Sequence, residues 1–200
     1  MTTERKPNIH LVGAGGAGFW TALSLVRSVD DPSRIVVYDD DDLQGGLGHS
    51  RLPVATPTTK KVDLLRGFIR VAMGDTPPTM RDVRFTGDEP VAGDWVIDAS
   101  DMATNVRAEV WKKARALGAR CLRVSYDGAD STIVIAEGIP LETAGEQGGI
   151  GYRNVPSLAL SLAAGGIAAE CIKRMLAEPC QHVEMQVSLS EWVRPIAKAA

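Results

Sequence analysis

Two kinds of apolar pattern follow one another along this chain. Short apolar runs rich in β-branched residues predict strands at 8–12, 34–38, 83–85, 95–97, 120–126 and 131–136. Apolar positions at helical spacing predict helices at 17–29, from Thr58 or Thr59 to about 71, and at 104–117. Strands and helices alternate through the first two-thirds of the sequence, which is typical of an α/β protein. We therefore predict a Rossmann-like, doubly wound, mostly parallel sheet with helices on both faces.

The last third of the chain departs from this order. Residues 157–176 predict a helix that is apolar on nearly every face, which indicates deep burial or a subunit interface. Val183, Met185, Val187 and Leu189 then alternate with polar residues, as in a strand. We expect the closing strands to add an antiparallel portion to the sheet.

Composition narrows the class of protein. Two hundred residues suit one domain, 1–200, and the shares of 44% hydrophobic and 24% charged residues are ordinary for a globular protein. A net charge of −3 without a basic stripe argues against nucleic acid as a partner. The longest uncharged run, about 154–169, is shorter than the roughly 20 residues of a membrane span. We expect no signal peptide, no membrane contact and a cytoplasmic protein.

A glycine-rich turn between the first strand and the first helix is the first sign of chemistry. Gly13, Gly15 and Gly18 have the G-x-G-x-x-G spacing of loops that bind a nucleotide phosphate at a helix N-terminus. The glycines of such loops allow a tight turn, close approach of backbone to phosphate, and close packing of helix on strand. Gly16 adds a fourth position without a side chain. We expect Gly13, Gly15 and Gly16 to bind phosphate.

Acidic residues follow two of the predicted strands. Asp39 ends the second strand, 26 residues after Gly13, and a carboxylate there can accept hydrogen bonds from both ribose hydroxyls. Asp41, two residues on, is a further candidate for nucleotide binding. Asp98 and Asp101 end a later strand. Because ligands of open α/β sheets bind outside the carboxyl ends of the strands, we expect these acids to face one crevice.

Two cations lie between these acids in the sequence. Arg51 falls in a glycine-rich loop, and Lys61 lies near the start of the following helix. Cations stabilise the charge of a triphosphate, and a carboxylate such as Asp101 can hold Mg²⁺. A ribose-binding acid, two cations and a second acid together favour ATP over NAD as the ligand.

The series of motifs resembles that of the ThiF/MoeB/E1 superfamily, over about residues 9–125 and more loosely to about 177. Five family motifs are matched here in the same order. Gly13-Ala14-Gly15-Gly16-Ala17-Gly18 matches G-x-G-G-x-G, Asp39-Asp40-Asp41 matches D-x-D, and Arg51 matches the arginine of N-L-x-R. Thr58-Thr59-Lys60-Lys61-Val62 matches G-K-x-K-A, and Asp98-Ala99-Ser100-Asp101-Met102 matches D-A-T-D-N. The family adenylates the C-terminal glycine of ubiquitin-like and sulfur-carrier proteins.

The resemblance implies an ATP-dependent adenylyltransferase that acts on a ubiquitin-like protein, a sulfur carrier or a peptide C-terminus. It implies that ATP lies across the glycine turn with its ribose on Asp39. It gives Lys61 and Arg51 contacts to the phosphates and gives Asp101 the placing of Mg²⁺. The family habit also implies a homodimer.

Two alternatives remain open at this point. The glycine spacing and Asp39 are equally compatible with an NAD-binding Rossmann oxidoreductase. A non-catalytic nucleotide-binding scaffold of the same fold is the other alternative, because the family loop N-L-x-R is matched here only at Arg51. Nicotinamide binding would favour the first alternative, and ATP binding without turnover would favour the second.

Overall fold

The computed structural model describes residues 5–43, 60–74, 78–127, 132–137, 158–178 and 184–188. Its strands are β1 (Ile9–Val12), β2 (Ile35–Tyr38), β3 (Thr79–Arg81), β4 (Trp95–Asp98), β5 (Arg120–Asp127), β6 (Thr132–Glu137) and β7 (Glu184–Ser188). Its helices are α1 (Gly16–Ser28), α2 (Lys61–Met73), α3 (Thr104–Ala116) and α4 (Leu158–Ala177), with a short 3-10 helix, η1 (Pro32–Arg34).

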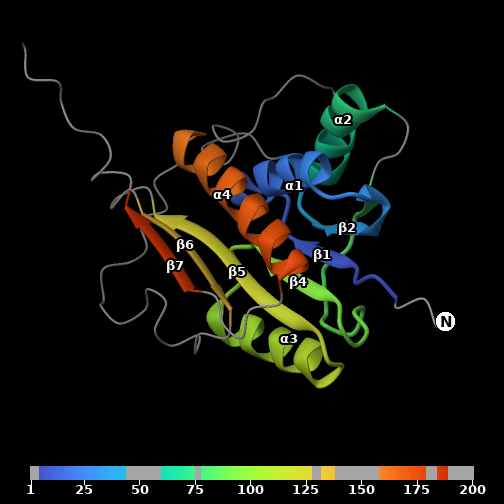
Figure 1. Cartoon of the computed structure of the whole chain (residues 1–200), viewed down its shortest axis with the longest axis vertical. Helices are drawn as coiled ribbons and strands as arrows, with labels where there is room; N and C mark the ends of the chain where they lie inside the picture. Colours follow the sequence, from blue (N-terminus) through green and yellow to red (C-terminus); the bar gives the residue numbers. More distant parts are fainter. Residues whose placement is uncertain are drawn as a thin grey trace, which may run out of the picture.

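These strands form one sheet in the order β3-β2-β1-β4-β5-β6-β7. The sheet is parallel from β3 to β5 and antiparallel from β5 to β7 (Figure 1). The chain moves outward from β1 to β3 and then crosses back to β4 on the other side of β1. The order thus reverses between β1 and β4, the place where open sheets bind ligands. The predicted fold class, including the antiparallel C-terminal portion, is confirmed.

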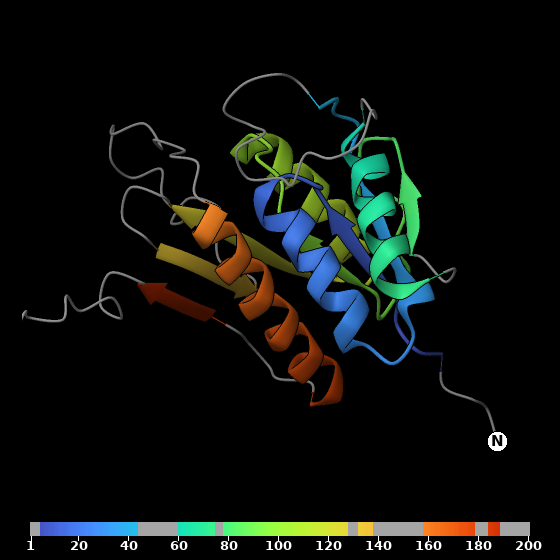
Figure 2. The ribbon, with the colours of Figure 1, turned by 90° about the horizontal axis from the view of Figure 1, so that it is seen from above.

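Helices cover both faces of the sheet. Figure 2 shows α4, α1 and α2 side by side in one layer, and α3 lies on the opposite face. The larger core lies under the three helices, and its members from β1 and α1 include Ile9, Leu11, Phe19 and Leu25, all fully buried. A smaller core lies under α3, around Trp111. A sheet covered on both faces accounts for the burial of every residue of β1 and β4.

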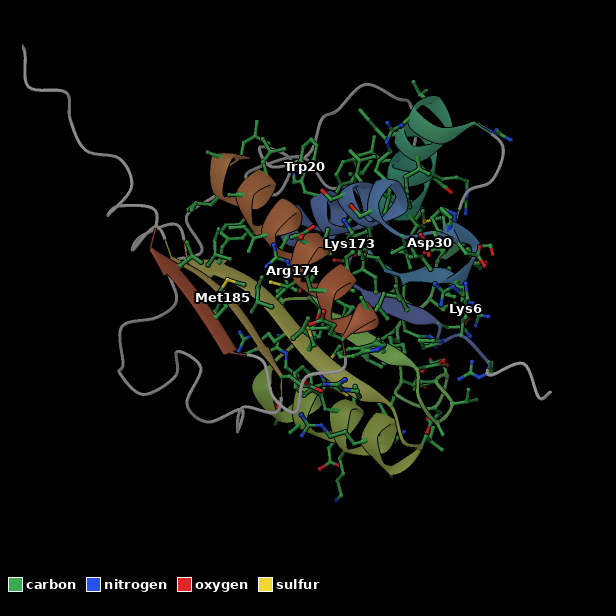
Figure 3. The ribbon with its side chains drawn as sticks, in the orientation of Figure 1. Lys6, Trp20, Asp30, Lys173, Arg174 and Met185 are labelled. Atoms are coloured by element: carbon green, nitrogen blue, oxygen red, sulfur yellow. The ribbon has the colours of Figure 1, made fainter. Side chains whose placement is uncertain are left out.

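Helix α4 is buried on one face only, so the predicted deep burial is wrong. Its inner face packs on α1 and the sheet, where Gly165 lies against the backbone of Trp20. Leu158 and Leu162 are exposed on its outer face, and Figure 3 shows Lys173 and Arg174 farther along the same helix. The alanines and glycines that made the helix look apolar all round include positions that face outward. A subunit interface there stays a prediction.

The strand predicted at 83–85 is also wrong, because the strand lies at β3. Thr79, Met80 and Arg81 pair in parallel with β2. Phe85 is buried, but its ring packs edge-on against Tyr38, with 5.0 Å between centroids, and not within a strand. The apolar side chain that suggested a strand therefore covers the face of the sheet on which α3 packs.

Helix α2 begins one or two residues later than predicted. Its N-cap is Lys60, whose extended backbone (φ −102°, ψ 138°) forms a β-bridge with Asp42. The predicted caps, Thr58 and Thr59, lie outside the described residues. Among the helices that the structure describes, none combines the length and apolar character needed to cross a membrane.

Candidate functional site

The glycine turn joins β1 to α1 in a closely packed arrangement. Gly13 has a φ of +93°, and its N–H donates to the Tyr38 carbonyl at 2.8 Å. A Cβ on Gly13 would come within 3.0 Å of the Ser100 backbone beyond β4. A Cβ on Gly18 would fall on the Gly13 carbonyl. Glycine is therefore required at Gly13 by backbone conformation and by space, and at Gly18 by space.

Gly15 leaves open space beside the start of α1, whereas Gly16 is buried. Gly15 is the N-cap, makes no side-chain cap, and accepts the first helical hydrogen bond from the Phe19 N–H at 2.8 Å. A Cβ built on Gly15 meets no atom within 4 Å, and the helix proper starts at Gly16. The first N–H groups of a helix have no partner within the helix, and they favour an anion. This arrangement fits the predicted phosphate-binding role of Gly15 and Gly16.

Asp39 lies directly beside this helix start. Its Oδ2 accepts the Ala14 N–H at 2.6 Å, and its Oδ1 accepts the Asp41 N–H at 2.9 Å. Burial raises the pKa of Asp39, while the bond from Ala14 and the charge of Lys61 oppose that rise. Each carboxylate oxygen has a second lone pair. A ligand hydroxyl that donates to either oxygen would favour the ionised carboxylate, which fits a ribose.

Lys61 lies beside Asp39 and Asp41, close to the glycine turn. Its Nζ is 2.5 Å from Asp41 Oδ2 and 3.8 Å from Asp39 Oδ1. The structure therefore brings Asp39, Asp41 and Lys61 together beside the glycine turn. In this arrangement the ammonium group is paired with Asp41, so a phosphate contact by Lys61 would exchange one oxygen partner for another.

Asp98 has a structural position in the molecule. It is 2% exposed, and its Oδ1 accepts the N–H and Oγ–H of Ser100 at 3.0 and 2.6 Å. Its Oδ2 accepts Arg107 Nε at 2.8 Å and Trp111 Nε1 at 3.0 Å. Four donors saturate this carboxylate, which ties the end of β4 to α3. Asp98 is not available to a ligand.

Asp101 follows on the same segment and is exposed. Among the described residues, no hydrogen bond or ion pair holds its carboxylate. Nor do the described residues contain a group of three or more potential metal ligands. Magnesium at nucleotide sites is commonly held by one or two carboxylates together with the phosphates, so a single open carboxylate fits the predicted role. Arg51, the remaining predicted residue, lies outside the described residues.

Sequence reasoning missed Lys60, which seemed to be a solvated neighbour of Lys61. Its Nζ lies 2.9 Å from Asp42 Oδ1 and 3.3 Å from Asp82 Oδ1. The sequence feature that could have indicated these ion pairs is the presence of two adjacent lysines, Lys60 and Lys61, after the four aspartates 39–42. For Asp98, the missed signal was the spacing of Arg107 and Trp111, which lie one helical turn apart.

Comparison with known proteins shows the fold. No family model matches the chain, and no curated protein matches its sequence. The structure is similar to that of E. coli MccB, with a TM-score of 0.69 and 11% identity over 92% of this chain and 60% of MccB. A structure of MccB with ATP has a TM-score of 0.67 and 11% identity, over 91% of this chain and 63% of MccB. The structure of PaaA has a TM-score of 0.63 and 16% identity, over 93% of this chain and 62% of PaaA.

This chain therefore shares the fold of MccB and PaaA. The chain spans less than two-thirds of the length of these proteins. MccB is a microcin C7 biosynthetic enzyme, and one of its structures contains N-formylated MccA. Another contains both AMPCPP and MccA.

Proposed function

We propose that this chain is a member of the ThiF/MoeB/E1 superfamily that binds ATP and adenylates the C-terminal carboxylate of a peptide, a ubiquitin-like protein or a sulfur carrier. One observation carries the proposal. The open N-terminus of α1 at Gly15 lies beside a carboxylate, Asp39, whose oxygens keep acceptor capacity, and Lys61 is 3.8 Å away. A phosphate site, a ribose acceptor and a cation are thus adjacent. The likeness to MccB, which has been solved with ATP, supports the same ligand.

The proposed reaction needs no covalent bond to the protein. A carboxylate oxygen of the partner attacks the α-phosphorus of ATP, an O–P bond forms, and the bond to the β-phosphate bridging oxygen breaks. The electron pair leaves with pyrophosphate, and the product is an acyl-adenylate. The chain contributes positioning and charge stabilisation.

Each residue has a defined part in this proposal. The first N–H groups of α1 bind phosphate, and Asp39 accepts the ribose hydroxyls. Lys61 and Arg51 stabilise charge on the phosphates, and Asp101 holds Mg²⁺, which supplies further neutralisation of that charge.

Calorimetry with ATP and Mg²⁺, and separately with NAD, tests nucleotide binding. We expect ATP to bind and NAD not to bind. We expect Lys61→Met to weaken ATP binding by about tenfold, as for loss of one charge-assisted contact. Lys113→Met is the matched control, because Lys113 also pairs with an aspartate, Asp88, at 3.0 Å, but on α3. NAD binding that does not depend on Lys61 would replace the proposal with an oxidoreductase.

Exchange of labelled pyrophosphate into ATP tests the chemical step. The probes are two sets of synthetic peptides with the same sequences, one with free C-terminal carboxylates and one with C-terminal amides. Exchange with a carboxylate peptide, none with its amide, and loss with Asp101→Asn are the expected results. ATP binding without exchange across the carboxylate set would favour a non-catalytic scaffold.

A further inference from the structure

Lys60 contacts two other segments at the carboxyl edge of the sheet. Its Nζ lies 2.9 Å from Asp42 Oδ1 and 3.3 Å from the Asp40 carbonyl, both in the segment that follows β2. The same Nζ lies 3.3 Å from Asp82 Oδ1, just beyond β3. Lys60 itself immediately precedes α2. One ammonium group therefore joins the ends of β2 and β3 to the start of α2.

Backbone contacts reinforce this junction. Lys60 and Asp42 form an antiparallel β-bridge, and the Lys61 N–H donates to the Asp41 carbonyl at 3.3 Å. The segment 39–42 and the segment 60–61 thus run side by side. Asp39 and Asp41 lie on one segment, and Lys61, which contacts both, lies on the other. Their mutual arrangement depends on whatever keeps the two segments together.

Electrostatics gives Lys60 a specific task. Four consecutive aspartates, 39–42, together with Asp82, place like charges close together, and like charges disfavour a compact arrangement. Lys60 places its charge against Asp42 and Asp82, while Lys61 serves Asp39 and Asp41. The Lys60 side chain is 30% exposed, and those of Asp42 and Asp82 are 55% and 48% exposed, so solvent weakens these ion pairs and the backbone contacts share the task of holding the segments together.

We propose that Lys60 is a positioning residue, which holds the Asp39–Asp42 segment against the start of α2 and so sets Asp39, Asp41 and Lys61 in place for the nucleotide. The inference rests on the proposed function for its last step alone. Lys60 acts through its neighbours and does not itself touch the ligand. A lysine suits the task because its three donors reach a carbonyl and two carboxylates at once.

Amide hydrogen exchange on the full chain tests the positioning without any nucleotide. The reporters are the N–H groups of Asp41 and Lys61, which donate to Asp39 Oδ1 and to the Asp41 carbonyl. In Lys60→Met we expect both to exchange about three- to tenfold faster, as for loss of a small ion-pair network. Lys60→Arg keeps the charge and should restore slow exchange. Unchanged exchange in Lys60→Met would overturn the positioning role.

The nucleotide step is tested by calorimetry with ATP and Mg²⁺ on the same variants. Lys60→Met should weaken ATP binding by about threefold to tenfold, Lys60→Arg should restore it, and Lys113→Met should leave it unchanged. Wild-type affinity in Lys60→Met would overturn the link to the nucleotide. If the wild type itself binds no ATP, the proposed function fails, and the amide exchange still decides whether Lys60 orders the acids.

Discussion

The two faces of the sheet are stabilised in different ways. Under α1, α2 and α4 the core is apolar, and Gly165 of α4 lies close against the backbone of Trp20 in α1. Under α3 the apolar cluster is smaller, and buried polar groups, namely His10, Asp94, Asp98 and Arg107, lie on that side. One face depends on close packing, and the other depends on complete pairing of its charged groups.

Acids at the ends of the strands differ in how many of their oxygens already accept a hydrogen bond. Asp98 and Asp101 lie three residues apart, yet four donors saturate Asp98 while Asp101 is exposed. Asp39 is intermediate, because it is nearly buried and has two donors. An acid with all its oxygens in use stabilises the fold, whereas an acid with acceptor capacity toward open space is a candidate for binding a ligand.

The largest effect is expected for the buried ion pair. Asp98→Ala leaves the guanidinium of Arg107, which is 4% exposed, without its carboxylate. We expect the free energy of unfolding to fall by about 3–5 kcal/mol, measured by urea denaturation. Asp101→Ala is the matched variant and should change it by less than about 0.5 kcal/mol. Equal losses of stability for Asp98→Ala and Asp101→Ala would show that the four donors to Asp98 add nothing to the stability of the fold.

The packed face can be tested with two neighbouring glycines of α4. Gly165→Ala would place a Cβ on the backbone of Trp20, and we expect a loss of about 1–3 kcal/mol from overpacking. Gly166→Ala points into open space and should raise stability by about 0.5–1 kcal/mol, because alanine favours the helix. Opposite signs in urea denaturation would confirm that α1 and α4 meet at Gly165. A gain from both substitutions would contradict it.

The polar face should respond to pH. His10 Nε2 lies 3.2 Å from Asp94 Oδ2, and Nδ1 lies 3.0 Å from the Tyr38 hydroxyl. Burial lowers the pKa of His10 below 6.5, although Asp94 acts in the other direction. Because the unfolded chain binds the proton first, stability should fall as pH drops below about 6.5, by at most about 1.4 kcal/mol per pH unit.

Urea midpoints at several pH values measure this dependence. His10→Gln removes the titrating ring and keeps a donor for Asp94, so its midpoint should be lower at neutral pH but flatter between pH 7 and 5. Burial also opposes ionisation of Asp94, but its hydrogen bonds prevail and lower its pKa, so further loss is expected only below 3.8. A wild-type midpoint that is constant from pH 7 to 5 would show that His10 does not titrate differently on folding.

Much of the fold could be predicted because burial on both faces leaves a plain pattern. Strands β1, β2 and β4 are apolar and β-branched, and the order of elements follows from them. Strand β3 could not be found in this way. Its Thr79 and Arg81 are exposed, and it is a strand because β2 offers it a free edge. At Phe85 a strand was predicted where none exists, because its apolar side chain packs on the sheet while its backbone is not part of a strand.

For the site, the sequence predicted the positions but not the pairings. The positions of Gly13, Gly15 and Asp39 could be predicted from local spacing, because each residue directly follows a strand that the sequence pattern reveals. The contact of Lys61 with Asp41 joins residues 20 apart, and that of Lys60 with Asp82 depends on where β3 ends. Such ion pairs are set by the packing of α2 beside the sheet, which no local pattern contains.

The reversal of strand order also has a consequence for how this chain is made. β1 is an inner strand, and one of its neighbours, β4, follows only after β2, α2 and β3 have been synthesised. The turn at Gly13 lies close to the Ser100 backbone, so this packing can form only once the chain extends beyond β4. Contacts so distant in sequence form slowly, and until they form the edge of β1 is open to wrong pairing. On the ribosome, the glycine turn therefore reaches its final packing only after β4 has been added.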